Sequence, residues 1–153
     1  MHETEALHIR RLTAEDLEPL HRLLSDPAVM RYLEPPFTRA QTEAFLQKAG
    51  MGREPLIRAV EDGRGFAGYV IYHPYDETSM ELGWVLASDR WGRGYALALT
   101  RQMICRARES GRDAVIECHP QQAATRHIAE MLGFRPCGMD GGCCVYRLAG
   151  KNE

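Results

Sequence analysis

The chain has 153 residues, of which 44% are hydrophobic and 26% charged, as is usual for a globular domain and unusual for a disordered or fibrous chain. A chain of this length buries about 68–70% of its unfolded surface, so its core needs neither disulfides nor metal ions. The 19 Lys and Arg against 21 Asp and Glu leave a formal charge of -2, and no apolar run reaches the ~20 residues of a membrane span. We therefore expect no affinity for nucleic acid or membranes and, because the acidic start does not resemble a signal peptide, a cytoplasmic protein.

Five cysteines are present, an odd number without any C-x-x-C pair. In a chain without an export signal this pattern favours reduced thiols over a disulfide framework or a zinc site. Cys143 and Cys144 are adjacent, so in a strand they would point to opposite faces of the sheet and would not bind one ion together. We expect no metal.

One strand and several helices are expected in the first third of the chain. Residues 7–12 predict a strand, and Thr13 with the acidic residues after it caps a helix that ends near Pro27. Apolar residues at 29–33 predict a short helical piece, which two prolines then stop. Thr38 caps a further helix that ends at Gly50.

Strands dominate from there, beginning with a hairpin of residues 55–60 and 66–72 around an Asp62-Gly63 turn. Alternation at residues 80–86 predicts a third antiparallel strand, with Glu81 among small or apolar neighbours. The remaining elements are a helix from Ala96 to Gly111, a strand at 114–118, a helix at 124–133 and strands at 135–139 and 143–148. This order predicts one domain over residues 1–153 of the α/β (α+β) class, with a mixed, mostly antiparallel sheet and flanking helices.

Two glycines, Gly92 and Gly94, lie where a predicted strand gives way to a helix. Glycine lets backbone N–H groups approach an anion, and the first turn of a helix adds unpaired N–H groups and the positive end of its dipole. Arg93 adds a full positive charge. The pattern predicts a phosphate-binding cradle, with a plain glycine turn as the alternative, and its spacing matches neither a dinucleotide fold nor a P-loop.

The segment Trp-Gly-Arg-Gly-Tyr-Ala at residues 91–96 resembles the acetyl-CoA-binding motif of the GCN5-related N-acetyltransferase (GNAT) superfamily. It has the form typical of the branch that resembles ribosomal-protein N-terminal acetyltransferases. Residues 122–134 look like the family's Asn-x-x-Ser block that runs to Leu-Gly-Phe, with Gln122 and Thr125 in place of Asn and Ser. The resemblance covers residues 7–148 in element order and is strong over residues 80–134.

This resemblance implies an acyl-CoA N-acyltransferase fold, in which the sheet splays open after the fourth strand and the pantetheine arm bonds to the exposed strand edge. By position, Val85 and Leu86 would form that edge, and a strand N–H there would stabilise the developing oxyanion. Acetyl-CoA is therefore the expected co-substrate. The other implied cofactor-binding residues are Trp91, Gly92, Arg93, Gly94, Tyr95 and Ala96 around the diphosphate, together with Gln122 and Thr125.

An amine acceptor is protonated at neutral pH, because its pKa lies about three units higher, so a base or a water chain must take its proton before attack. Glu117 matches a proposed base position in enzymes that acetylate ribosomal-protein termini, and Glu81 matches the carboxylate of histone-type relatives. We rank these two carboxylates almost equally as candidate bases. The alternative interpretation is that Glu117 is a surface residue of a strand and that Glu81 is the structural partner of an arginine. His119 is a third candidate, because histidine titrates near neutral pH.

In related enzymes a tyrosine is often proposed to protonate the leaving thiolate, but this chain has Ala129 at that position. Tyr95, Tyr146 or water would replace it, although a CoA thiolate also leaves without an acid. Cys118 as an acyl-carrying nucleophile has no identifiable base and orienting acid around it, so direct transfer is favoured.

The sequence thus predicts an N-acetyltransferase that moves an acetyl group from acetyl-CoA to a primary amine in a ternary complex. The expected acceptor is the amine of a small molecule or of a protein N-terminus. The sequence does not choose among protein termini, polyamines, aminoglycosides and amino-acid analogues, since all of them use the same donor site. The alternative is a CoA-binding sensor or interaction module that keeps the fold without turnover. A homodimer is compatible with either function.

Overall fold

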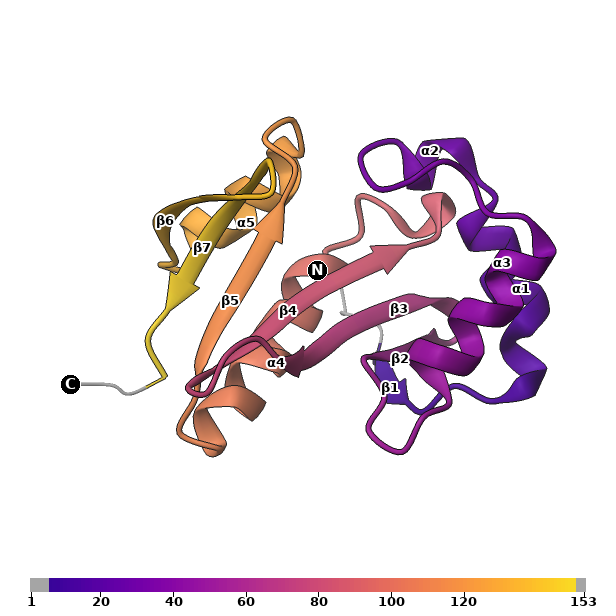
Figure 1. The fold of residues 1–153 in the computed structure, drawn as a ribbon, viewed down its shortest axis with the longest axis horizontal. Coiled ribbons are helices and arrows are strands. Elements are labelled where there is room, and N and C mark those ends of the chain that lie inside the picture. Colours follow the sequence, from indigo (N-terminus) through magenta and orange to yellow (C-terminus); the bar gives the residue numbers. More distant parts are fainter. Residues whose placement is uncertain (1–5, 151–153) are drawn as a thin grey trace. The chain divides into compact units, whose positions relative to one another are not determined.

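The computed structural model describes residues 6–150. Its strands are β1 (His8–Arg10), β2 (Ile57–Asp62), β3 (Gly65–Pro74), β4 (Ser79–Leu86), β5 (Asp113–Cys118), β6 (Arg135–Asp140) and β7 (Cys143–Leu148). They form one seven-stranded sheet in the order β1-β2-β3-β4-β5-β7-β6 (Figure 1). β4 and β5 run parallel, whereas the pairs β1–β2, β2–β3, β5–β7 and β6–β7 are antiparallel. The predicted class and the mostly antiparallel sheet are confirmed.

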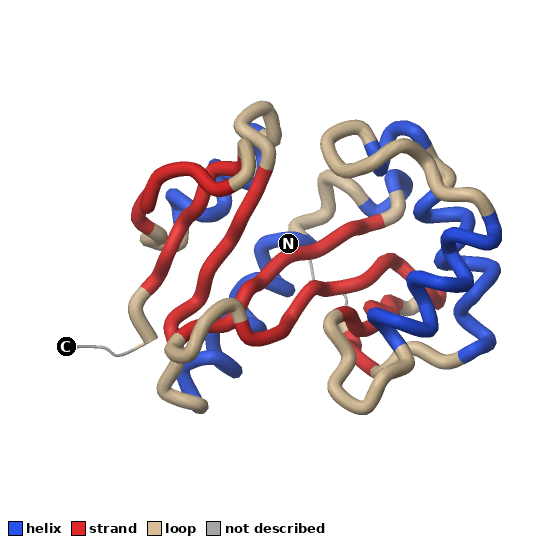
Figure 2. Tube along the Cα trace, viewed as in Figure 1, coloured by secondary structure: helices blue, strands red, loops and turns tan. Residues whose placement is uncertain are grey.

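The helical elements are η1 (Ala14–Asp16), α1 (Leu17–Leu24), α2 (Pro27–Met30), α3 (Arg39–Phe45), η2 (Leu46–Gly50), η3 (Ser88–Arg90), α4 (Tyr95–Glu109) and α5 (Ala123–Met131) (Figure 2). The chain groups into two compact units. The first unit comprises Met1–Ile71 and Trp84–Tyr95, and the second unit comprises Tyr72–Gly83 and Ala96–Glu153. That residues 1–153 act as one domain stays a prediction.

The core of the first unit lies between its helices and its strands. Leu20, Leu23 and Leu24 recur at helical spacing on α1 and are almost fully buried. Burying one such side chain contributes about 1.5–3 kcal/mol, so this face of α1 holds the helix to the sheet. The cluster contains Leu12, Leu20, Leu23, Leu24, Met30, Leu46, Ala49, Ile57, Ala59, Tyr69 and Val85.

Threonine caps begin two helical segments, as predicted. The Thr13 hydroxyl accepts a hydrogen bond from the Glu15 N–H at 3.3 Å, and the Asp16 carboxylate accepts one from the Thr13 N–H at 2.8 Å. At the second cap, the Thr38 hydroxyl accepts from the Gln41 N–H at 3.2 Å. Both caps satisfy N–H groups that the first helical turn leaves without a partner.

The short helix α2 begins earlier than predicted, at Pro27 instead of near residue 29. The Asp26 carboxylate accepts a hydrogen bond from the Ala28 N–H at 2.9 Å and so caps the helix. Proline suits the first helical position because its missing N–H would have no partner there. The same proline that suggests the end of one helix from the sequence therefore begins the next.

In the second unit, β5 pairs with β7 and α5 covers one face of this pair. Ile116 lies opposite Tyr146 and Cys118 lies opposite Cys144, so these four side chains share a face. α5 lies on that face, because the Arg126 Nε donates a hydrogen bond to the Tyr146 hydroxyl at 3.1 Å. The other face of β5 carries Glu117.

The parallel ladder between β4 and β5 is short. It consists of the pairs Ser79–Asp113, Met80–Ala114 and Glu81–Val115. No further β4–β5 pair follows within the second unit, although β5 keeps pairing with β7 as far as Cys118. The splay of the sheet after the fourth strand stays a prediction.

Within residues 6–150 no helix is long and apolar enough to cross a membrane, and no group of three or more His, Cys, Asp or Glu side chains could hold a metal ion. All five cysteines are free thiols, with Cys118 buried and Cys105 and Cys137 exposed. The cytoplasmic location stays a prediction.

Replacing Gly68 with alanine is expected to destabilise the fold by about 2–4 kcal/mol. Gly68 on β3 has a φ of 149°, and a Cβ there would overlap the Val85 carbonyl oxygen on β4. Urea unfolding followed by circular dichroism measures the change. Gly63→Ala is the matched control in the neighbouring turn, because a Cβ at Gly63 meets no atom within 4 Å. Equal stability of the two variants would contradict the close approach of these strands.

Candidate active site

The segment that joins β4 to α4 is an open, glycine-rich loop. Residues 91–94 are exposed, whereas Tyr95 at the start of α4 is buried. Gly92 and Gly94 have φ angles of 75° and 80°, which other residues rarely adopt, and a Cβ at either position would meet no atom within 4 Å. The loop therefore leaves room for a ligand to approach its main chain, as an anion cradle requires.

The strand edge predicted to hold the pantetheine arm lies at the end of β4. The side chains of Val85 and Leu86 are buried, each residue having 6% exposure. The Trp91 indole Nε1 donates a hydrogen bond to the Leu86 carbonyl oxygen at 3.0 Å, while Trp91 itself is 51% exposed. The indole is thus fixed at its polar edge, while about half of the residue stays exposed. Any contact of Val85 and Leu86 with a ligand must come from their backbone.

A buried carboxylate, Asp62, binds both ends of the loop. The Arg90 guanidinium donates from Nε to Asp62 Oδ2 at 2.9 Å and from Nη2 to Oδ1 at 3.1 Å, and the Tyr95 hydroxyl donates to Oδ2 at 2.8 Å. The Arg90 hydrogen bond holds the pKa of Asp62 well below its usual range, so the carboxylate stays ionised. The sequence marks Asp62 only as a turn residue and Tyr95 as a cofactor contact. No local pattern would have joined these three residues.

The two candidate bases, Glu81 and Glu117, project from one face of the sheet in the second unit. Glu81 pairs with Val115, and Glu117 lies two residues further along β5. Paired residues share a face, as do residues two apart on one strand, so the carboxylates lie on the same side. Both side chains are half-buried. The structure therefore brings together the two groups that the sequence ranks almost level.

Two further polar residues join these carboxylates, and the sequence pattern identifies neither. The Tyr75 hydroxyl donates a hydrogen bond to Glu117, which raises the pKa of Tyr75 to about 12. His73 Nε2 lies 3.7 Å from Glu81 Oε1. Burial raises the pKa of Glu81, His73 opposes this shift and the charge of Glu117 adds to it. A carboxylate whose pKa is raised accepts a proton more readily at neutral pH, as a general base must.

The residues at the start of α5 bind one another. Gln122 Oε1 accepts a hydrogen bond from the His119 N–H at 2.8 Å, and His119 Nδ1 accepts one from the Gln121 N–H at 3.0 Å. Both side chains thus stabilise the turn between β5 and α5. This role makes His119 a weaker candidate base than either carboxylate. Thr125 is half-buried on the first turn of α5, and the roles of Gln122 and Thr125 in cofactor binding stay predictions.

The two tyrosines considered as general acids are bound to other protein groups. Tyr95 donates its hydroxyl hydrogen to Asp62. The Tyr146 hydroxyl accepts from Arg126 Nε at 3.1 Å and donates to Glu130 Oε1 at 3.4 Å. Both hydroxyl groups already donate their hydrogen to a carboxylate of the protein, so water is the better candidate donor.

Cys118 does not fit an acyl-carrying nucleophile. Its side chain is buried, and burial raises the pKa of its thiol to about 11, so the reactive thiolate is scarce at neutral pH. It also lies opposite Cys144 on the α5 side of the strand, the face away from Glu117. This agrees with the expectation of direct transfer.

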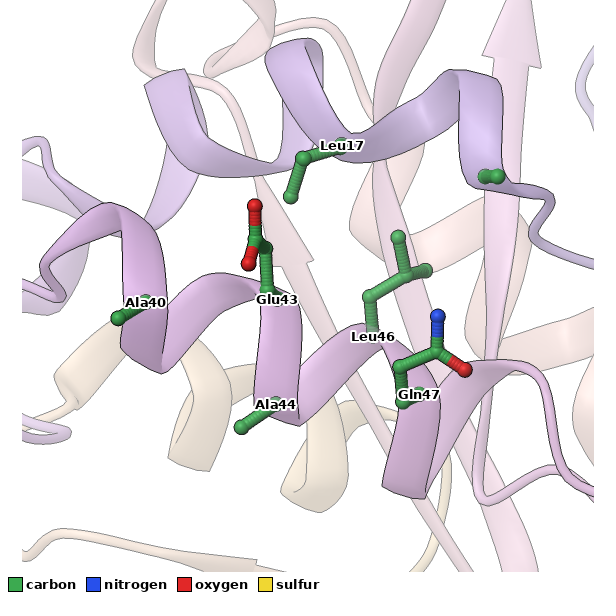
Figure 3. A pocket seen from close by; sticks show the side chains of 7 residues that line it. Leu17, Ala40, Glu43, Ala44, Leu46 and Gln47 are labelled. Carbon is green, nitrogen blue, oxygen red and sulfur yellow. The ribbon is translucent and has the colours of Figure 1, made fainter.

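An open pocket in the first unit lies between α1 and α3 and includes none of the predicted site residues (Figure 3). Its lining is mostly apolar, with Glu43 and Gln47 as the polar side chains. The lining residues are Ala14, Leu17, Ala40, Glu43, Ala44, Leu46 and Gln47.

The predicted residues fall into two groups. Val85, Leu86 and the loop up to Tyr95 belong to the first unit, where Arg90 and Asp62 join them. The second unit holds Ala96, Glu81, Glu117, Gln122 and Thr125. The first group has the features of an anion site, and the second has those of a proton-transfer site.

Known proteins resemble this chain over most of its length. Residues 6–135 match the family model described as Acetyltransferase (GNAT) domain. The uncharacterized N-acetyltransferase YnaD of Bacillus subtilis is 26% identical over 145 residues, which cover 92% of this chain and 85% of the relative.

Solved structures share the fold. A GNAT-family acetyltransferase from Bacillus anthracis superimposes with a TM-score of 0.80 at 24% identity, covering 97% of each chain. The spermidine N-acetyltransferase of Vibrio cholerae, solved in complex with CoA and spermine, gives a TM-score of 0.74 at 22% identity and covers 92% of each chain. Since the family match spans most of the sequence and includes the glycine loop, the chain belongs to the GNAT acetyltransferase family and is an acyltransferase.

Proposed function

We propose that this protein is an acetyl-CoA-dependent N-acetyltransferase that acts on the primary amine of a small molecule or a protein N-terminus. The observation that carries the proposal is the pair of half-buried carboxylates, Glu81 and Glu117, on one sheet face where the β4–β5 ladder ends. The loop at residues 91–96 favours the branch that resembles ribosomal-protein N-terminal acetyltransferases. The family match at residues 6–135 includes parts of both units, which supports one domain over residues 1–153.

The glycine loop is the proposed site for the diphosphate of acetyl-CoA. The backbone N–H groups from Gly92 to the start of α4 bind the phosphate oxygens, and Arg93 contributes an exposed positive charge. The open space at Gly92 and Gly94 fits a ligand that approaches the main chain. Trp91 supplies an apolar surface beside it.

The acceptor is an amine that enters as an ammonium ion. Two carboxylates on one face attract such a cation and offer a place for its proton, so Glu117 or Glu81 deprotonates it before attack. A structural neighbour that is a spermidine N-acetyltransferase and was solved with spermine supports amine acceptors in this fold. Tyr75 orients Glu117 through its hydrogen bond.

Acetyl-CoA supplies the acetyl group as an activated thioester: the amine nitrogen bonds to the acetyl carbon as the carbon–sulfur bond breaks. One ammonium proton passes to a carboxylate before attack, and the second proton that the nitrogen loses as the amide forms reaches the leaving thiolate through water. No covalent intermediate on the protein is required, in agreement with the burial of Cys118.

Glu117→Gln and Glu81→Gln test the proposed bases. At least one should slow acetyl transfer tenfold or more, because loss of a general base typically costs about 10²–10⁴ in rate. Affinity for acetyl-CoA, measured by calorimetry, should stay nearly the same. Glu109→Gln, at the exposed end of α4, is the matched control and should transfer at the wild-type rate. Full activity of both base variants would exclude the carboxylates, and CoA binding without turnover on any amine would favour a sensor.

Glu81→Gln should gain stability relative to wild type as the pH rises above the ordinary pKa of a glutamate. Burial raises the pKa of Glu81, so in the window above its ordinary pKa the native state binds more protons than the unfolded chain. The contribution of Glu81 to the free energy of unfolding therefore falls as the pH rises through this window, and glutamine removes that contribution. Melting temperatures across the pH range measure the difference, with Glu109→Gln as a control that should follow the wild type. A constant offset between Glu81→Gln and wild type would exclude the burial effect.

Arg93→Glu and Gly94→Val should each weaken CoA binding by about tenfold or more, equal to 1.4 kcal/mol. The first places a negative charge beside the diphosphate, and the second puts a bulky side chain into the open space and strains a φ of 80°. Gly111→Val is the matched control, since Gly111 has a φ of 69° and similarly open surroundings at the far end of α4. Calorimetry gives the dissociation constants. If Gly94→Val and Gly111→Val bound CoA equally well, the loop would not be the diphosphate site.

A further inference from the structure

Asp62 is a buried carboxylate that the proposed reaction does not use. It is the last residue of β2, its side chain has 0% exposure, and it lies 28 residues before Arg90 and 33 before Tyr95. These two partners flank the exposed residues 91–94. One carboxylate therefore binds both the residue before the glycine loop and the residue after it.

Both carboxylate oxygens of Asp62 accept hydrogen bonds. Besides Arg90 and Tyr95, the Arg64 N–H donates to Asp62 Oδ1 at 2.8 Å, which ties the carboxylate to the β2–β3 turn. The remaining guanidinium nitrogen of Arg90, Nη1, donates to both carboxylate oxygens of Asp89 at 3.1 Å. A charge-assisted, two-pronged Arg–carboxylate pair has a defined geometry, so the loop ends are held at fixed positions.

This arrangement also fits the electrostatics of an anion site. Arg90 lies between two carboxylates, the buried Asp62 and the exposed Asp89, so it neutralises Asp62 while one negative charge of the cluster remains at the surface for Arg93 to offset. The charge of Arg90 is therefore committed to the protein, and Arg93 is the exposed cation within the loop. Asp62 acts on a ligand only through the loop that it holds.

We propose that Asp62 is a positioning residue for the diphosphate of acetyl-CoA. By binding Arg90 and Tyr95 together, it holds the loop between them in the conformation that presents its N–H groups. Because the loop is already ordered, it loses less conformational entropy when acetyl-CoA binds, and the affinity is higher. This inference rests on the proposed function, in which the same loop holds the diphosphate.

Tyr95→Phe and Asp62→Asn test the inference when each variant is assayed with two acetyl donors. Acetyl-CoA contains the diphosphate, whereas S-acetyl-pantetheine lacks it. Both variants should raise the Kd for CoA and the KM for acetyl-CoA, Asp62→Asn by about tenfold or more. The KM for S-acetyl-pantetheine should change by a much smaller factor. A purely structural role would weaken both donors alike.

Asp16→Asn is the matched control. Asp16 is a buried carboxylate of the same unit, and it accepts two hydrogen bonds of 2.9 Å from Arg10 without contacting the loop. This variant should lower the melting temperature and leave the ratio of the two donors unchanged. If Asp62→Asn fails to fold, Tyr95→Phe decides, because it removes one hydroxyl group and keeps the aromatic ring.

Wild-type CoA affinity in Tyr95→Phe and Asp62→Asn, or equal losses with both donors, would overturn the inference. Gly94→Val separates this failure from that of the proposed function. If Gly94→Val also leaves CoA binding intact, the loop itself is not the diphosphate site. If Gly94→Val weakens binding and the other two variants do not, only the role of Asp62 is wrong.

Discussion

The candidate chemistry depends on where the parallel ladder between β4 and β5 ends. Three residue pairs join the strands, and Glu81 belongs to the last of them. Glu117 lies two residues beyond that pair on β5, so the carboxylates share a face instead of being separated by the sheet. A shift of the register by one residue would send Glu81 to the opposite face. The proton-transfer site is thus a consequence of strand pairing.

A second constraint acts on the glycine loop. Removing a carboxylate and a guanidinium from water is costly, and a buried ion pair such as Asp62–Arg90 adds little net stability compared with apolar residues. What the pair supplies is geometry, since its hydrogen bonds have fixed directions and distances. A loop with two glycines has wide conformational freedom, and the bonds to Asp62 limit that freedom at both ends.

Most secondary structure follows from local signals in the sequence. The threonine caps, the helical spacing of leucines on α1 and the turn before β3 each depend on residues a few positions apart, and the structure has them where predicted. The start of α2 differs because Pro27 can either end one helix or begin the next, and its neighbour Asp26 decides the outcome by capping. Gln122 stays a predicted cofactor contact, and no local pattern foretold that its side-chain oxygen also accepts a hydrogen bond from the turn that precedes α5.

The sequence by itself determined the fold class, the order of the elements, the family motif around Gly92 and Gly94, and the two candidate carboxylates. Only the tertiary structure decided that Glu81 and Glu117 share a face, that Tyr75 bonds to Glu117, and that Asp62 holds the ends of the loop. The physical reason is the range of the interactions. Caps, turns and periodicity act between near neighbours, whereas these contacts join residues far apart in the chain through strand register and side-chain packing, which local patterns do not encode.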